Sequence, residues 1–279
     1  MGYISKPLPG CFVDWTHPLS RELVEYWLLN EGSGSGLAGL TSRFSPGSLI
    51  ASPLWHNGVL FDGSTQYGSL STLGSFLSDT YNKGFSVAAR YACTGATSAA
   101  YGICGSLGTG AVNGFQLLIN RNESGSIEAN HLGLSIYGTG ASLSAGSDAS
   151  LSDGLRHSII VAVQPGLSAA SVAMYFDRKS LEVTVGTSTI TAMANMAEPL
   201  RVGARSIGGV ISLYLPGAIE YLAIWLRPLK TAEVIDFQVN PYANILSPSY
   251  RRYFIPAAAG GLSIPVAMHH YKQLRTTNR

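Results

Sequence analysis

The stretch Arg156-His-Ser-Ile-Ile-Val-Ala-Val-Gln164 indicates most directly how this chain folds. Side chains along an extended strand point alternately to its two faces. Here the two sets are His157, Ile159, Val161 and Val163 on one face, and Ser158, Ile160 and Ala162 on the other. Because both faces are largely apolar, we predict an inner strand that is covered on both sides.

Similar short apolar runs continue in both directions, separated by clusters of Gly, Ser, Asn and Asp. Turn signals at this spacing are typical of a β-sandwich. The predicted strands are Leu23–Asn30, Gly58–Phe61, Phe85–Cys93, Tyr101–Gly105, Phe115–Asn120, His131–Ile136, Val172–Phe176, Leu181–Val185, Leu200–Ala204, Val210–Leu213 and Ala218–Leu226. Only Lys230–Asn240 is predicted as a helix, with Thr231 as its N-cap. We therefore predict an all-β fold of two antiparallel sheets with one short helix.

The composition agrees with this fold and excludes several classes of protein. Charged residues make up 12% of the 279 residues, against roughly 25% in typical soluble domains. The net charge of +2 is too small for a nucleic-acid-binding or membrane-surface protein. No apolar run reaches the roughly 20 residues of a spanning helix, and residues 1–7 lack the layout of a secretion signal.

The strands fall within one predicted domain, residues 23–240, between an N-terminal lead (1–22) and an extended C-terminal arm (241–279). After Asp236 the chain contains five basic residues and no acidic ones. The arm has no apolar periodicity, so by itself it should be disordered. Its order would depend on contacts with its own domain or with a neighbouring subunit, and we expect the neighbour.

The residues that carry chemistry are scattered. No Glu-x-Asp-x-x-Glu spacing of a glycoside hydrolase occurs. The Gly-x-Ser-x-Gly motif at Gly32–Gly36 is followed by too short an apolar run for a nucleophile elbow. The histidines show no metal-ligand spacing, and Asp62-Gly63 and Asp153-Gly154 indicate turns. We therefore predict no catalytic residue, metal site or cofactor.

The three cysteines, Cys11, Cys93 and Cys104, cannot form a closed set of disulfides. Cys93 and Cys104 lie on two apolar runs that could pair as a hairpin, which would allow a cross-strand bond. We favour buried free thiols instead, because Cys packs as a small hydrophobic residue.

Several tyrosines near predicted loops could form an aromatic platform for a sugar. The candidates are Tyr101, Tyr137 and Tyr214, with Tyr67 and Tyr81 as further members. Tyr is also common in sheets, so the sequence does not separate a platform from ordinary packing.

As an ordered set, seven segments between Leu23 and Asn240 resemble laminin-G-like, concanavalin A-type jelly rolls. The segments are Leu23-Val-Glu-Tyr-Trp-Leu-Leu-Asn-Glu-Gly32, Gly58-Val-Leu-Phe-Asp-Gly-Ser-Thr-Gln-Tyr67, Phe85-Ser-Val-Ala-Ala-Arg90, Asp153-Gly-Leu-Arg-His-Ser-Ile-Ile-Val-Ala-Val163, Val172-Ala-Met-Tyr-Phe-Asp177, Leu200-Arg-Val-Gly203 and Gly217–Val234. One departure is Arg178, which stands where the family customarily has Gly. The calcium ligands of the eukaryotic members have no secure counterpart.

The flanks, Val13–Val24 and Pro241–Ala257, resemble the borders of such domains in virion proteins of tailed bacteriophages. The resemblance implies a non-enzymatic structural protein on the particle surface, made in the host bacterial cytoplasm. We expect a capsid decoration (cement) protein that contacts the major capsid protein, other virion subunits or further copies of itself. The expected contact residues are Arg251, Arg252, Tyr253 and Phe254, because Arg and aromatics are enriched at interface centres. The alternative is a carbohydrate-binding adhesin on a tail or head fibre, which would bind a host surface glycan.

Overall fold

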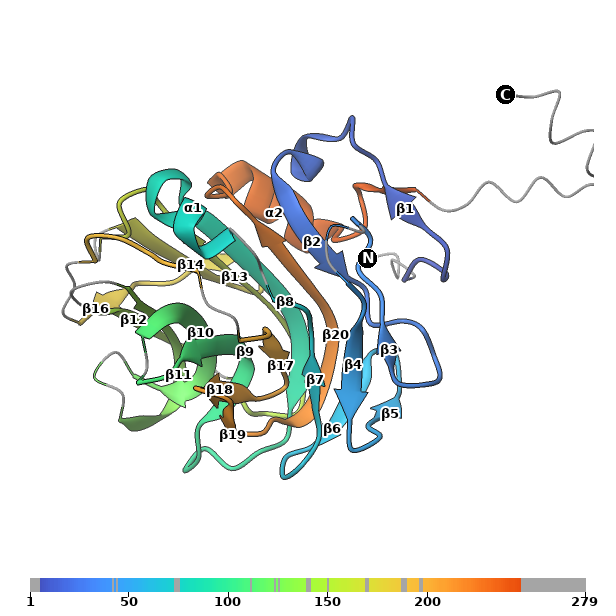
Figure 1. Ribbon diagram of the computed structural model, residues 1–279, viewed down its shortest axis with the longest axis horizontal. Helices are drawn as coiled ribbons and strands as arrows, with labels where there is room; N and C mark the ends of the chain where they lie inside the picture. The colour runs from blue at the N-terminus through green and yellow to red at the C-terminus, as the bar shows by residue number, and fades with distance from the viewer. Residues whose placement is uncertain are drawn as a thin grey trace, which may run out of the picture. The chain divides into compact units, whose positions relative to one another are not determined.

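The computed structural model describes residues 6–246, except positions 42, 44, 73–75, 111, 123, 125, 139–141, 150, 169–170, 187–189 and 196–197. Within these residues the chain forms two large antiparallel sheets that face one another (Figure 1). The arrangement is the all-β jelly-roll sandwich that the sequence predicts.

The 8-stranded sheet is built around the stretch that indicated the fold. In order across the sheet it contains β15 (Lys179–Ser180), β14 (Val172–Phe176), β13 (Arg156–Val163), β8 (Phe85–Cys93), β20 (Pro216–Trp225), β6 (Val59–Asp62) and β5 (Leu54–Trp55), and β2 (Leu23–Trp27) also pairs with β20. β13 is thus an inner strand, hydrogen-bonded to β14 and β8.

The 11-stranded sheet faces it. Its order is β16 (Thr184–Val185), β12 (Ser142–Asp148), β11 (Ile127–Tyr137), β10 (Val112–Arg121), β9 (Tyr101–Gly108), β17 (Arg201–Val202), β7 (Tyr67–Ser69), β4 (Gly47–Ile50) and β3 (Gly36–Leu37). The hairpin of β18 (Arg205–Ile207) and β19 (Val210–Ser212) joins it at β9, where Ile207 pairs with Leu107 in parallel.

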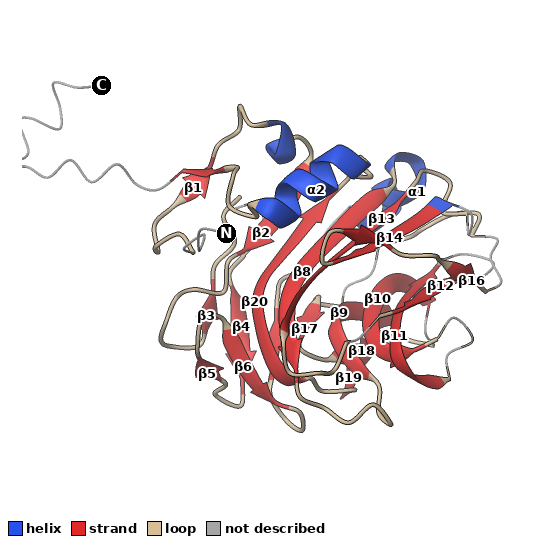
Figure 2. Ribbon diagram, turned by 180° about the vertical axis from the view of Figure 1, so that it is seen from behind, coloured by secondary structure: helices blue, strands red, loops and turns tan. Residues whose placement is uncertain are grey.

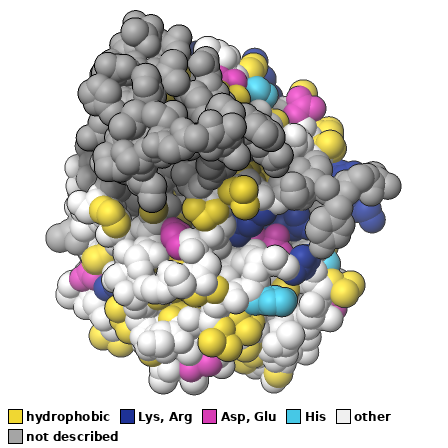
Figure 3. Space-filling model, turned by 90° about the vertical axis from the view of Figure 1, so that its right-hand side faces the viewer, with side chains coloured by type: hydrophobic (Ala, Val, Ile, Leu, Met, Phe, Trp, Pro, Cys, Tyr) yellow, Lys and Arg dark blue, Asp and Glu magenta, His cyan; other side chains and the backbone are white. Residues whose placement is uncertain are grey.

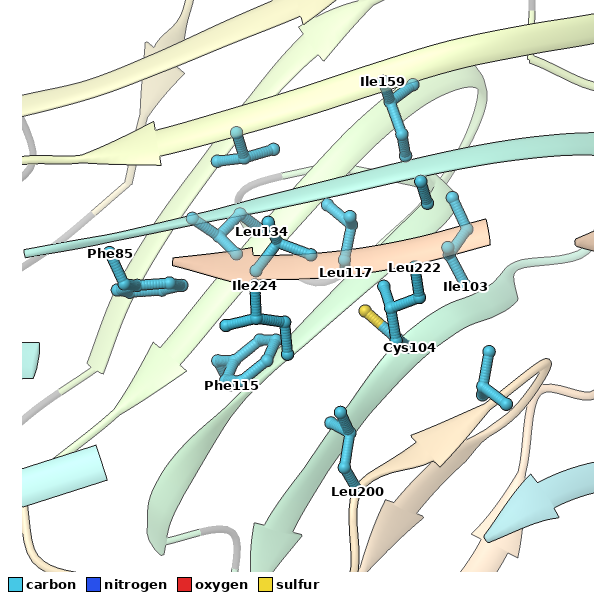
Figure 4. Packing of buried hydrophobic residues seen from close by; sticks show 14 of the residues in the cluster. Phe85, Ile103, Cys104, Phe115, Leu117, Leu134, Ile159, Leu200, Leu222 and Ile224 are labelled. Carbon is cyan, nitrogen blue, oxygen red and sulfur yellow. The ribbon is translucent and has the colours of Figure 1, made fainter. Parts of the chain in front are cut away.

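The main core fills the space between the two sheets (Figure 4). Ile159, Val161 and Val163 of β13 lie in it. Phe85 of β8 and Phe115 of β10 meet across the gap, with ring centroids 5.4 Å apart. Burial of each such side chain stabilises the fold by roughly 1.5–3 kcal/mol.

A second core covers the opposite face of the 8-stranded sheet. Helix α2 (Thr231–Val239) lies over this face (Figure 2) and inserts Phe237 against Tyr221 and Trp225. Ile160, from the other face of β13, belongs to this core. The prediction that β13 is covered on both sides is therefore confirmed.

Both chain ends, as far as they are described, pack on this second core. The N-terminal lead contributes Val13 and Leu19, and Trp225 donates a 2.6 Å hydrogen bond from Nε1 to the Leu19 carbonyl. Residues 241–246 end in β21 (Ile245–Leu246), which pairs with β1 (Phe12–Val13) of the lead. Residues 6–22 and 241–246 are thus held by their own domain, whereas we expected a neighbouring subunit to order the arm from residue 241 onward. The arm beyond residue 246 lies outside the described residues.

The helices differ in part from the prediction. α2 is confirmed, but Thr231 is its first residue and Lys230 occupies the N-cap position. The 3-10 helix Pro18–Ser20 and helix α1 (Phe76–Lys83) were not predicted. In the part of the chain described, no helix is long and apolar enough to cross a membrane.

The cysteines are free thiols, and all three are buried. Cys93 lies in β8 and Cys104 in β9, so they belong to opposite sheets and do not pair as a hairpin. The hairpin alternative was therefore wrong. Both residues line the main core, where a small hydrophobic side chain packs well.

Candidate functional site

The outer face of the 11-stranded sheet carries the candidate site. Gly68 of β7 faces the core between the sheets. A Cβ at this position would lie 2.3 Å from Cγ1 of Val202, a core residue. Neighbours along a strand point to opposite faces. Tyr67 and Ser69 therefore point outward, and so does Arg201, which precedes Val202 in β17.

Four outward residues, Tyr67, Ser69, Arg201 and Tyr214, form a group that we call the tyrosine–arginine cluster. The guanidinium carbon of Arg201 lies 5.5 Å from the centroid of the Tyr67 ring, a cation–π contact. Arg201 also donates from Nη1 to the Ser69 hydroxyl. The Tyr67 and Tyr214 rings are 6.2 Å apart and inclined at 51°. All four residues are half-buried, so each keeps part of its surface accessible, although the Nε atom of Arg201 is itself buried.

The strand register extends this cluster into a row of small and polar side chains across the sheet. Arg201 lies between Ser69 of β7 and Gly105 of β9. From one side to the other the row contains Ser48, Ser69, Arg201, Gly105, Gln116, Ser135 and Ser144. Gln116 is buried, and its Oε1 has no hydrogen-bond partner among the described residues. A buried amide oxygen without a donor is unusual in folded proteins.

Two further arginines belong to the same sheet, Arg205 of β18 and Arg121 of β10. Arg205 of β18 donates to the Ser212 hydroxyl from Nε at 3.2 Å and from Nη2 at 3.1 Å. Burial lowers the pKa of Arg205, and the nearby positive charge of Arg121 lowers it further. Tyr137 has the opposite effect and raises the pKa of Arg205. The β18–β19 hairpin thus brings Arg205 close to Arg121 and Tyr137 of the sheet.

The structure separates the tyrosines that the sequence suggested. Tyr214 belongs to the cluster, and Tyr137 points outward because its neighbour Ile136 lies in the core. Tyr101 instead packs against the core and donates a 3.2 Å hydrogen bond to the Ala96 carbonyl. The predicted contact residues Arg251, Arg252, Tyr253 and Phe254 lie outside the described residues.

Sequence reasoning missed Arg201 and Ser69 as members of a site. β7 and β17 contain only three and two residues, and they lie far apart in the chain. An alternation that short gives no periodic signal. The sequence contains one indication of Arg201. It stands between the apolar Leu200 and Val202 in a predicted strand, an alternation that places it on the face opposite to theirs.

A separate pocket of about 270 Å³ lies where the N-terminal lead meets β5. Its lining includes Lys6, Asn30, Trp55, His56 and Asn57. The Lys6 ammonium donates hydrogen bonds to three backbone carbonyls, so it holds the lead in place. Burial lowers the pKa of Lys6 to about 8, against the opposing effect of Glu220.

Strand pairing also brings together Glu128, His131 and Asp148, with one potential ligand atom of each within 4.8 Å of the others. His131 Nδ1 lies 3.0 Å from Oδ1 of Asp148, its partner in the β11–β12 register. The pairing joins residues 17 positions apart, so the spacing of the histidines in the sequence gives no indication of it. Glu128 and Asp148 are exposed, a setting in which acidic groups commonly lie close together without an ion.

The motif Gly32–Gly36 leads into the two-residue strand β3. A nucleophile elbow requires a strand before the serine and a helix after it. The motif is therefore a turn that enters the 11-stranded sheet.

No family model and no curated protein sequence matches this chain. Among solved structures, the binding domain of botulinum neurotoxin serotype D/C is similar with a TM-score of 0.59 and 8% identity, over 78% of this chain and 52% of that chain. A structure of botulinum neurotoxin type C, whose cell entry depends on two ganglioside molecules, gives 0.59 and 9% identity over 78% and 51%. The chain therefore spans about half the length of these neurotoxin chains.

A third similar structure is the CBM40 domain of the Ruminococcus gnavus IT-sialidase. Its TM-score is 0.43 and its identity 12%, over 57% of this chain and 84% of that chain. At these low identities the comparisons with the neurotoxin domains establish the β-sandwich fold alone. The structures named here are binding domains.

Proposed function

We propose that this protein is a non-enzymatic, carbohydrate-binding module. The tyrosine–arginine cluster carries the proposal, because it places two half-buried tyrosine rings beside a cation and a hydroxyl group on the outer face of the sheet. A sugar ring has apolar C–H faces that pack on an aromatic ring, and hydroxyls that need polar partners. The fold likeness to binding domains that include a ganglioside-dependent toxin supports this class of ligand.

A glycan array probed with the full-length chain tests the proposal. We expect Tyr214→Ala to abolish binding, because it removes the outward ring, and Tyr214→Phe to retain most of it. Tyr101→Phe is a matched control, since Tyr101 packs against the core. Binding by no glycan, or equal binding by the Tyr214→Ala variant with an unchanged unfolding midpoint, would contradict the proposal.

A second candidate role is a structural protein on the surface of a bacteriophage particle, as a capsid decoration protein or on a tail or head fibre. The observation that favours it is an exposed apolar group where the two described ends meet. The cross-strand partners Phe12 and Leu246 are 50% and 42% exposed, and nearby Trp15 is 55% exposed. Exposed apolar groups of this kind are typical of protein–protein contacts.

Removal of the C-terminal segment tests this role. Because β21 and the Pro241 carbonyl hold the folded domain together, the truncation must follow Ser247 and not Asn240. We expect residues 1–247 to fold but to be absent from purified particles, whereas the full chain is incorporated. Normal incorporation of the truncated chain would exclude anchoring by this segment.

A further inference from the structure

Five of the described arginines fall into two groups according to their partners. Where an arginine holds the fold together, it meets a carboxylate: Arg227 lies 2.7 Å from Glu233, and Arg156 and Arg90 lie 2.9 and 3.4 Å from Glu220. On the outer face of the 11-stranded sheet, Arg201 and Arg205 form no ion pair with any described residue.

The described partners of these two charges are neutral: the Tyr67 ring and the Ser69 hydroxyl for Arg201, and the Ser212 hydroxyl for Arg205. Arg201 is half-buried, and its Nε has no acceptor among the described residues. The row through Arg201 contains only Ser, Gly and Gln besides it. Arg205 is likewise half-buried, and it has a second arginine, Arg121, nearby. Partial removal of a cation from water is unfavourable unless an anion approaches it.

The neighbouring groups define what kind of anion fits. A guanidinium group binds carboxylate or sulfate-like oxygens through two parallel N–H donors. Next to it lie the Tyr67 and Tyr214 rings, with centroids 6.2 Å apart, and the Ser69 hydroxyl, which accepts a hydrogen bond from Arg201. The cation and the aromatic surface therefore belong to one small area.

We propose that the tyrosine–arginine cluster binds an anionic sugar residue, one that carries a carboxylate or a sulfate group. The charged group contacts Arg201, the sugar ring packs on Tyr214, and the positive potential of Arg205 and Arg121 increases the affinity. This inference rests on the proposed carbohydrate-binding function and adds to it the chemical class of the ligand.

Calorimetric titration of the full chain tests the inference with four ligands of matched length: a neutral hexose oligomer, a uronic-acid oligomer, a sulfated hexose oligomer and single-stranded DNA. We expect one or both anionic sugars to bind at least about tenfold more tightly than the neutral oligomer. The two anionic arms distinguish carboxylate from sulfate. We also expect the affinity to fall as the salt concentration rises.

Variants assign the effect to the cluster. Arg201→Gln should lower the ratio of anionic-sugar to neutral-sugar affinity towards one, whereas Arg201→Lys should retain part of the preference. Arg21→Gln removes the same charge at an exposed position outside the row and should have no effect. If Arg201→Gln does not fold, Arg205→Gln and the salt dependence still test the inference.

The outcomes separate the two proposals. Equal affinity for neutral and anionic sugars would overturn the inference and leave carbohydrate binding intact. Absence of binding to any sugar would overturn both. Tighter binding of DNA than of every sugar would show that the arginines recognise phosphate along a nucleic-acid chain, which also overturns the inference.

Discussion

The Nζ atom of Lys6 donates a 2.7 Å hydrogen bond to the carbonyl oxygen of Glu220, 214 residues further along the chain. The same ammonium donates to the carbonyls of Leu29 and Asn57, at 3.0 and 3.2 Å. One side chain thus joins the N-terminal lead to β20 and to two loops of the sandwich.

We predict that Lys6→Met destabilises the fold by about 1–3 kcal/mol. Methionine retains the apolar stem of the side chain but leaves three carbonyl groups without their donor. Urea unfolding of the full chain measures the loss, and limited proteolysis should show earlier cleavage within residues 6–22.

Lys83→Met serves as the control for this prediction. Lys83 forms an exposed pair with Asp79 at 3.5 Å, and such a pair contributes at most about 1 kcal/mol. Equal stability of the Lys6→Met variant and the unsubstituted chain would show that the lead is not held by this ammonium.

A glycine that bridges to Trp27 of β2 provides a second prediction. A Cβ at Gly39 would lie 2.2 Å from the carboxyl carbon of Glu25. Glu25 is buried, and its Oε1 accepts hydrogen bonds from the backbone amides of Tyr26 and Thr41. Gly39→Ala must displace this carboxylate, so we expect a loss of about 1–3 kcal/mol in chemical unfolding.

Gly36→Ala is the matched control, because a Cβ at Gly36 has no atom within 4 Å. That substitution should leave the unfolding midpoint nearly unchanged. Similar effects of the two substitutions would mean that the glycines act through backbone entropy and that the Glu25 contact is unimportant.

The parts of the fold that sequence predicts best are those with a long local pattern. The alternation of β13 predicts a strand covered on two sides, and both cores that cover it are present. Helix α2 is present as predicted, but the apolar spacing of Ala232, Ile235 and Val239 does not mark its packed face. These three residues are exposed, and the helix packs through Val234, Phe237 and Gln238. Helix α1 was missed because only eight residues form it, and its buried side chains Phe76 and Leu77 are adjacent in sequence.

The candidate site depends on contacts that no local pattern encodes. Tyr67 and Tyr214 could be proposed from their places near loops. The cation Arg201 could not, because β7 and β17, with three and two residues, meet only through the sheet register. Gly102 contributes to the same arrangement, because its missing side chain lets the backbone of Ala204 pack against β9. Such close approaches are a property of the tertiary fold.

The imidazole of His157 provides a third prediction, on the pH dependence of stability. Nδ1 lies 2.6 Å from Asp177 and Nε2 lies 2.9 Å from Asp153, an arrangement that fits the doubly protonated ring. Burial alone would lower the pKa of His157, but the hydrogen bonds with the two carboxylates raise it overall. The stabilisation is therefore complete below the unfolded pKa of about 6.5 and is lost as the pH rises through the folded pKa.

We expect His157→Gln to destabilise the protein more at about pH 5.5 than at about pH 9, as measured by urea unfolding at both values. At low pH the stabilisation ends where the partner carboxylate becomes protonated. The pKa of Asp153 is lowered, mainly by its hydrogen bond with His157. Asp153→Asn should reduce the pH dependence without abolishing it, because Asp177 remains. An identical loss at both pH values would show that the ring acts only by packing on Phe176, 4.6 Å away.

The thiol of Cys104 provides the last prediction. Complete burial raises the pKa of this thiol to about 12, so at pH 8 the thiolate fraction is about one in ten thousand. Cys11 lies at the edge of the second core, with 9% of its surface exposed. We therefore expect iodoacetamide to modify native Cys11 much faster than Cys104, as followed by peptide mass spectrometry. In guanidinium chloride the core no longer exists and all three thiols are exposed. Cys11, Cys93 and Cys104 should then react at similar rates. Rapid modification of native Cys104 would show that the two sheets separate readily. The packing of Phe85 against Phe115 would then not hold the 11-stranded sheet, with its outer face, rigidly in place.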